Sequence, residues 1–372
     1  MNNNEIIRIY GTNYKEMTKT LLKEADLSGR IKPGMRIAIK PNLVCPVPAE
    51  FGATTHPEVV AGIIEYLREN GFNNISIIEG SWIGDSTEDS FEYCGFNSLS
   101  REYDVPLIDT QKEKSHKVDC DGEELVICDC MSNVDFLINV PVLKGHCQAK
   151  ITCALKNMKG LIPNSEKRRF HALGLHNPIA HLNTAIKQDF VVVDHICGDL
   201  DFEDGGNPIV RNCIMAAVDP VLTDAYVCKL FGLSIDDVPY VKLAGKLGIG
   251  NSNIDDLKLI TIGDTVFEEE LPITHKMLEV SYVTEDADSC SSCYASLAGA
   301  LSRLNEEKLL EKFTHKISIG QGHRGKTGEY GIGNCTKDFL HTVKGCPPEE
   351  DEIYEAIKKW IEEDEKDGKA CN

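Results

Sequence analysis

Short apolar runs alternate with amphipathic stretches over most of the chain, from Ile6 to about Asp264. The apolar runs have the length and the β-branched composition of strands, and the amphipathic stretches have the period of helices. This alternation predicts an α/β fold, with a mainly parallel sheet covered by helices. The predicted strands are residues 6–11, 35–44, 75–80, 104–110, 136–141, 189–200, 212–219 and 257–264, with a hairpin at 117–129.

The composition changes after Asp264, where an acidic connecting stretch at 265–276 leads into a region with several cysteines. Residues 316–322 predict a further strand, and amphipathic stretches follow Cys290 and Cys346. We therefore expect two domains, an α/β domain at 1–272 and a smaller C-terminal α/β domain with several cysteines at 273–372.

The net charge of the chain is -20 at pH 7, and 42% of its 372 residues are hydrophobic. This composition supports a packed core, and the negative charge argues against nucleic acid or an anionic membrane as a partner. No uncharged apolar run approaches the roughly 20 residues that a membrane-spanning helix needs. The N-terminus also lacks the pattern of a signal peptide, so we expect a globular protein of the cytoplasm.

One segment, residues 136–160, departs from this negative charge. It begins with an apolar run, which predicts a buried strand, and no acid occurs between Phe136 and Ser165. The polar residues that follow the apolar run are Lys144, His146, Lys150, Lys156, Asn157 and Lys159. An anionic ligand that carries phosphate or carboxylate is the simplest explanation for this cationic segment.

Polar side chains also follow other predicted strands, and the carboxyl ends of parallel strands lie at one edge of a sheet. We therefore expect one shared anion site at that edge. Its candidate ligand-binding residues are Lys40, Asn42, Thr54, Thr55, Lys156, Asn157 and Lys159, and its candidate catalytic residues are Lys144, His146 and His171. The histidines are candidates for proton transfer at neutral pH. Alternatively, strand-end loops are polar in most proteins, and each histidine only positions its neighbours.

Several of these segments together resemble the domain-of-unknown-function 362 family. The similar motifs are KPN at 40–42, TTHPEVV at 54–60, NVPVLKGH at 139–146, ALKNMKG at 154–160 and DPVLTDA at 219–225. The resemblance covers residues 5–264 and implies an association with iron-sulfur clusters, often held by a ferredoxin module, without implying a particular reaction. This chain has no C-x2-C-x2-C-x3-C run, so a cluster here would be held differently. The strands and loops are also distantly similar to the N-terminal region of nickel-pincer lactate racemases, an analogy of fold alone.

The chain contains 15 cysteines, which is many for a protein of the cytoplasm. Disulfides are rare there, so metal ligation or a reducing, anaerobic habitat should explain them. Most lie beside apolar runs, where a cysteine usually serves as a small hydrophobe. Four differ because they lie in loops or at the starts of helices: Cys290, Cys293, Cys335 and Cys346.

Four thiolates in this arrangement can hold a 4Fe-4S cluster or a structural zinc ion. The Gly-Cys-Pro-Pro element at 345–348 resembles the last cluster-ligand segment in the small subunits of nickel-iron hydrogenases, which favours the 4Fe-4S cluster. Zinc, or thiols without a metal, are the alternatives.

The sequence leaves three functions open. The first is an iron-sulfur oxidoreductase that acts on a small anion, together with a redox partner protein or a second redox centre. The second is a pure electron carrier, which would need no cationic site. The third is a zinc-stabilised protein with isomerase or transferase chemistry in the α/β domain. Walker, G-x-G-x-x-G, serine-elbow and H-E-x-x-H motifs are absent, so nucleotide binding and hydrolysis are not supported.

Overall fold

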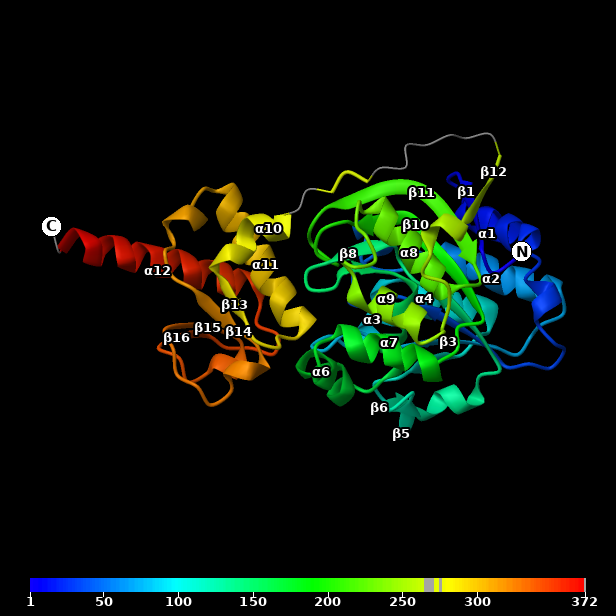
Figure 1. Ribbon diagram of the computed structural model, residues 1–372, viewed down its shortest axis with the longest axis horizontal. Helices are drawn as coiled ribbons and strands as arrows, with labels where there is room; N and C mark the ends of the chain where they lie inside the picture. The colour runs from blue at the N-terminus through cyan, green and yellow to red at the C-terminus, as the bar shows by residue number, and fades with distance from the viewer. Residues whose placement is uncertain (264–270, 274–275, 371–372) are drawn as a thin grey trace.

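The computed structural model describes residues 1–263, 271–273 and 276–370. Figure 1 shows two lobes, an N-terminal lobe coloured blue to green and a C-terminal lobe coloured yellow to red. The predicted domain boundary between residues 272 and 273 lies beside positions outside the described residues, and it stays a prediction. In the described part of the chain, no helix is long and apolar enough to cross a membrane.

The N-terminal lobe is built on an eight-stranded sheet in the order β12-β1-β11-β10-β7-β2-β3-β4. All neighbouring strands are parallel except β11, which runs antiparallel to β1 and β10. The predicted α/β fold with a mainly parallel sheet is therefore confirmed. The strands are β1 (Glu5–Tyr10), β2 (Ile37–Pro41), β3 (Ile75–Glu79), β4 (Leu107–Asp109), β7 (Phe136–Val140), β10 (Phe190–Asp199), β11 (Pro208–Ala217) and β12 (Lys258–Ile262).

Helices cover both faces of this sheet and bury two separate apolar cores. Successive side chains of a strand point to opposite faces, so Ile37 and Ile39 of β2 enter one core and Ala38 enters the other. The first core packs against α1 (Tyr14–Glu24), α2 (Pro57–Glu69), α3 (Thr87–Tyr93) and α4 (Phe96–Tyr103). The second packs against α5 (Ala154–Asn157), α6 (Asn164–Ala172), α7 (His176–Ala185), α8 (Pro220–Leu230) and α9 (Pro239–Lys246).

Two hairpins complete the N-terminal lobe. The strands β5 (Ser115–Cys120) and β6 (Glu123–Cys128) form the predicted hairpin around Asp121-Gly122. A second hairpin joins β8 (Lys144–His146) to β9 (Lys150–Thr152), where the sequence predicts a loop. The prediction misses it because three paired residues per strand are too few to show a period of two.

The C-terminal lobe has its own parallel sheet, in the order β13-β14-β15-β16, and its own apolar core. Figure 1 shows α11 and the long α12 lying beside this sheet. The elements are α10 (Lys276–Val280), β13 (Thr284–Asp286), α11 (Ser291–Glu306), β14 (Ile317–Ile319), β15 (Tyr330–Ile332), β16 (His341–Val343) and α12 (Glu350–Ala370).

The two lobes meet at Gln148, in the turn between β8 and β9. Its Nε2 donates to the Ser289 hydroxyl at 2.8 Å and to the Ser289 carbonyl at 3.1 Å. Its Oε1 accepts a hydrogen bond of 3.1 Å from the Ser291 hydroxyl. One side chain thus holds the segment that leads into α11 against the β8–β9 hairpin.

We expect Gln148→Ala to loosen the contact between the lobes, because the alanine makes none of these hydrogen bonds. The cost should be ~1–2 kcal/mol, seen as faster amide hydrogen exchange in residues 286–292. Gln111→Ala is the matched control, because Gln111 donates only to backbone carbonyls of its own lobe, such as that of Asp85 at 3.0 Å. Equal exchange in residues 286–292 for the two variants would contradict the prediction.

Candidate functional site

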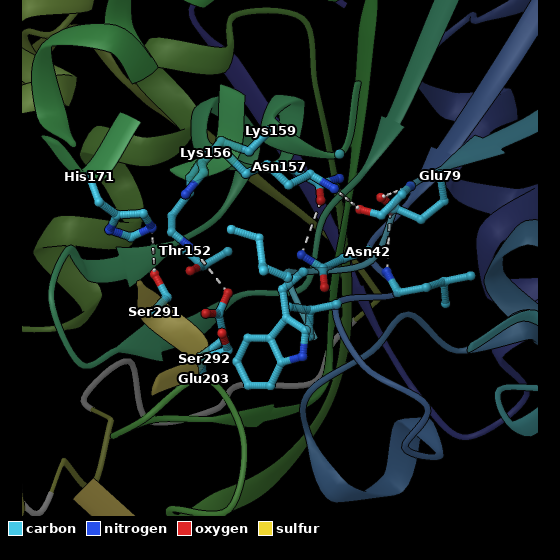
Figure 2. A pocket seen from close by; sticks show the side chains of 17 residues that line it. Asn42, Glu79, Thr152, Lys156, Asn157, Lys159, His171, Glu203, Ser291 and Ser292 are labelled. Carbon is cyan, nitrogen blue, oxygen red and sulfur yellow. Dashed lines mark hydrogen bonds and ion pairs between the residues drawn. The ribbon is translucent and has the colours of Figure 1, made fainter. Parts of the chain in front are cut away.

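A cavity opens at the carboxyl ends of β2 and β3, beside the β8–β9 hairpin and α5. Its empty volume, including open solvent at its entrance, is about 550 Å³. The polar side chains that line it are those of Asn42, Glu79, Thr152, Lys156, Asn157, Lys159, Lys167, His171, Glu203, Ser291 and Ser292. Figure 2 shows Asn42, Asn157 and Glu79 on one side of the view and Thr152, His171 and Ser291 on the other.

The structure brings together most of the residues that the sequence proposes for an anion site. Asn42, Lys156, Asn157, Lys159 and His171 line the cavity. Lys40, Lys144 and His146 are buried and contact residues that line it, as the distances below show. Thr54 and Thr55 are buried, but they do not line the cavity.

Lys40 is paired with Glu79 and is not a free cation. Its Nζ lies 2.7 Å from Glu79 Oε2, and the side chains of the pair are 0% and 3% exposed. Burial lowers the pKa of Lys40, and the Glu79 carboxylate opposes this shift. Gly160 makes room for the pair, because a Cβ at this position would lie 2.1 Å from Glu79 Oε1 and 2.5 Å from Lys40 Nζ.

Glu203 organises the remaining predicted cations. Its Oε1 lies 2.9 Å from Lys156 Nζ and 3.7 Å from Lys144 Nζ, and its Oε2 lies 3.1 Å from His146 Nε2. Burial alone would raise the pKa of Glu203, but the charge of Lys156 holds it well below its usual value, and the charge of Lys144 acts in the same direction. The backbone φ of Glu203 is 106°, and such a conformation costs ~1–3 kcal/mol in a residue other than glycine. Strain of this kind often marks a functional site.

His146 is held in one orientation by these contacts. Its Nδ1 accepts hydrogen bonds of 3.0 Å from the backbone N–H groups of Gln148 and Ala149, so its Nε2 carries the ring hydrogen. This Nε2 lies 3.1 Å from Glu203 Oε2, without the geometry of a hydrogen bond to any described residue. Burial, with the charge of Lys156, lowers its pKa to about 4. His146 is therefore neutral at pH 7, which favours a positioning role over proton transfer.

Thr54 and Thr55, which the sequence proposes as anion-binding residues, have their hydroxyl groups hydrogen bonded to the backbone. The Thr54 hydroxyl donates to the Val47 carbonyl at 2.7 Å, and the Thr55 hydroxyl donates to the Val140 carbonyl at 2.9 Å. These hydroxyls satisfy backbone carbonyls that would otherwise be buried without a donor. The two residues shape the loop before α2.

Lys159 and Lys167 have no carboxylate partner among the residues that the structure describes. Lys167 Nζ donates to the carbonyls of Gly80 and Ser81 at 3.0 and 2.6 Å. Burial, with the charge of Lys156, lowers the pKa of Lys159 to about 7, and burial lowers the pKa of Lys167 to about 8. His171 Nε2 lies 3.4 Å from the Ser291 hydroxyl, and burial lowers its pKa well below the usual value.

The four candidate metal ligands lie in the C-terminal lobe as free thiols. Cys290 is the N-cap residue of α11, and Cys293 lies in the first turn of that helix. Cys335 follows β15, and Cys346 precedes α12 and is exposed. Burial, with the nearby Cys346 and Cys335, raises the pKa of Cys290 to about 11.

The cysteine segment adjoins the cavity. Ser291 and Ser292, which separate Cys290 from Cys293, line it. The charge of Lys159 also acts on the pKa of Cys290, in the direction that favours the thiolate. The predicted anion site and the predicted metal ligands therefore lie at the same junction between the lobes.

Residues 37–229 match the family described as Domain of unknown function (DUF362). This chain belongs to that family. The match contains every motif on which the resemblance in the sequence rests, and it includes Lys40, Glu79, Lys156 and Glu203. The four candidate metal ligands lie outside it.

Two further proteins are similar to this chain. The thylakoid-associated protein sll1697 of Synechocystis sp. is 26% identical over 243 residues, which are 62% of this chain and 74% of that protein. The solved lactate racemase apoprotein of Thermoanaerobacterium thermosaccharolyticum is 14% identical, with a TM-score of 0.38. That similarity covers 57% of this chain and 54% of the racemase chain, so it spans about half the length of the solved protein.

Sequence reasoning missed Glu203, Lys167 and the role of Glu79. The lysines of the predicted site could have pointed to these acids, because several buried lysines require buried carboxylates nearby. Glu79 follows β3 at the same sheet edge as Lys40, and Glu203 follows β10. The sequence could not identify the pairs without the strand order, since Glu203 stands in an acidic, glycine-rich stretch typical of a surface turn.

We expect Glu203→Gln to lower the free energy of unfolding by ~3 kcal/mol, because the glutamine leaves Lys156 buried without a counter-charge. Denaturant unfolding at pH 7 measures this loss. The control Glu124→Gln removes the exposed partner of Lys117, at 2.6 Å, and should cost less than ~1 kcal/mol. A Glu203→Gln protein as stable as this control would show that Glu203 does not hold the lysines.

Proposed function

We propose that this protein is an iron-sulfur oxidoreductase that binds a small anion in the cavity between the lobes. In this proposal, a 4Fe-4S cluster is held by Cys290, Cys293, Cys335 and Cys346. The observation that carries the proposal is the position of Ser291 and Ser292, which line the cavity and stand between two of the cysteines.

The arrangement of the described side chains argues against a single zinc ion. Zinc binds thiolates at about 2.3 Å, so its ligands must converge on one point. Within the described residues, no three His, Cys, Asp or Glu side chains are arranged to hold a single metal ion. A 4Fe-4S cube takes one thiolate at each of four corners, so its ligands stand farther apart. The surroundings also suit a cluster, because Arg324 Nε donates to Cys335 Sγ at 3.4 Å and Gly333 lies beside Cys293.

The residues of the cavity would bind and orient the anion. Lys159 offers an ammonium without a carboxylate partner, Lys156 offers one shared with Glu203, and His171 faces the cavity beside Ser291. When bound, the cluster would supply or accept single electrons. A two-electron conversion would therefore need a second redox centre or a partner protein, and the exposed Cys346 suits electron exchange with such a partner.

A pure electron carrier is the second candidate, and the exposed Cys346 alone favours it. Against it stands the cavity, because a carrier does not need buried lysines beside its metal centre. The expected location in the cytoplasm stays a prediction, and the name of the Synechocystis protein refers to thylakoids for that protein only.

Anaerobic purification followed by iron, sulfide and zinc analysis tests the proposal. We expect iron and sulfide in equal amounts, with the paramagnetic spectrum of a reduced 4Fe-4S cluster. Cys293→Ser should lose most of the iron, whereas Cys197→Ser should keep it, because Cys197 is a buried thiol whose Sγ contacts the Glu50 carbonyl. Zinc without sulfide, or full iron content in Cys293→Ser, would reject the proposed cluster.

A further inference from the structure

The two walls of the cavity have opposite chemistry, and together they define a class of ligand. One wall comes from the segment 152–160 and presents Thr152, Lys156 and Lys159. The other presents four apolar side chains, those of Leu43, Val44, Trp82 and Ile83. A ligand that fills the cavity must therefore be polar at one end and apolar at the other.

Thr152 carries a hydroxyl that lacks a partner. The residue is 1% exposed, and its Oγ1 has no hydrogen-bond partner within the described part of the chain. Leaving such a group unsatisfied costs ~1–3 kcal/mol. An acceptor atom of a ligand would remove this cost, because Thr152 lines the cavity.

The lysines around the cavity outnumber its carboxylates, because Lys159 and Lys167 line it without an ion pair among the described residues. Two carboxylates, Glu79 and Glu203, already pair with Lys40 and Lys156. Lys159 is then the lining ammonium without an ion pair or hydrogen bond among the described residues. A monocarboxylate would pair with this ammonium and, unlike inorganic phosphate, it can also carry an apolar body for the apolar side chains that line the cavity.

Trp82 gives the opposite wall its apolar surface. The indole Nε1 donates to the Asp85 carboxylate, so the polar atom of the ring already has a partner. The ring itself lines the cavity next to Ile83, which is 5% exposed. A compact apolar or aromatic group would be desolvated against this wall.

We infer that the cavity binds a small monocarboxylate with a compact apolar body, its carboxylate toward Lys159 and its body toward Trp82. The binding of this ligand is inferred from the cavity alone. Any conversion of the bound ligand rests on the proposed function. The carboxylate accepts hydrogen bonds from the ammonium and from the Thr152 hydroxyl. The apolar body covers the wall that would otherwise face water.

Titration of the full chain with benzoate tests the inference, using calorimetry and tryptophan fluorescence. We expect saturable binding, with acetate and the neutral analogue benzamide each weaker by about tenfold or more. Inorganic phosphate should bind no better than benzamide. The chain has two tryptophans, so Trp82→Phe should abolish the fluorescence change while calorimetric binding persists. Phosphate binding tighter than benzoate, or acetate binding equal to benzoate, would overturn the inference.

Two variants locate the carboxylate. Lys159→Met should weaken benzoate binding by about tenfold, and Lys187→Met, whose side chain is 84% exposed, should leave it unchanged. Thr152→Val should also weaken benzoate binding, and it should raise the melting temperature because it removes an unsatisfied hydroxyl. Thr152→Val supplies the test if Lys159→Met does not fold. Wild-type benzoate affinity in the folded variants would overturn the inference.

Iron analysis of the same preparations separates this inference from the proposed function. Benzoate binding by a protein without iron and sulfide would reject the proposed cluster and support the ligand class. A protein with a complete cluster and no benzoate binding would support the proposed cluster and overturn the inferred ligand class.

Discussion

A buried lysine needs a counter-charge, and two buried carboxylates meet this need at the centre of the molecule. Glu79, at the end of β3, pairs with Lys40 on the neighbouring strand β2. Glu203, after β10, pairs with Lys156 on α5. Removing either carboxylate would leave a desolvated cation, which is far more costly than the loss of an exposed pair. The two carboxylates therefore fix both the shape of the cavity and the cations that remain free.

Because internal partners, including Glu203, engage lysines of the cationic segment at 136–160, fewer of these lysines can bind an anion than the sequence suggests. From the sequence alone, every lysine in it is a candidate for binding an anion. In the structure, Lys144 donates to the Ala53 carbonyl at 2.6 Å, and Lys156 lies against Glu203. Most of the positive charge thus holds the α/β lobe together. Lys159 has no ion pair among the described residues, and burial, with the charge of Lys156, lowers its pKa to about 7.

The sequence predicted the sheet well because each strand carries its own period and its own ends. The sequence also predicted that Lys40, Asn42 and Lys156 lie at one edge of the sheet, because the carboxyl ends of parallel strands lie together at that edge. The pairing of Lys40 with Glu79 did not follow, because it depends on β2 lying beside β3 in the sheet. The hydrogen bonds of Thr54 and Thr55 did not follow from the sequence for a related reason, because the acceptor that a hydroxyl finds depends on carbonyls that only the folded loop brings near.

The junction between the lobes gives the cavity and the cysteines a common electrostatic environment. Lys159 lines the cavity and also favours the thiolate form of Cys290. A negative ligand beside Lys159 would cancel part of the positive potential that Lys159 exerts at Cys290. A more negative metal centre on the thiolates would in turn repel the ligand. If both sites are occupied, binding at one must change the affinity of the other by the same factor in both directions. The contact between His171 and Ser291 connects the cavity to the segment that carries Cys290 and Cys293.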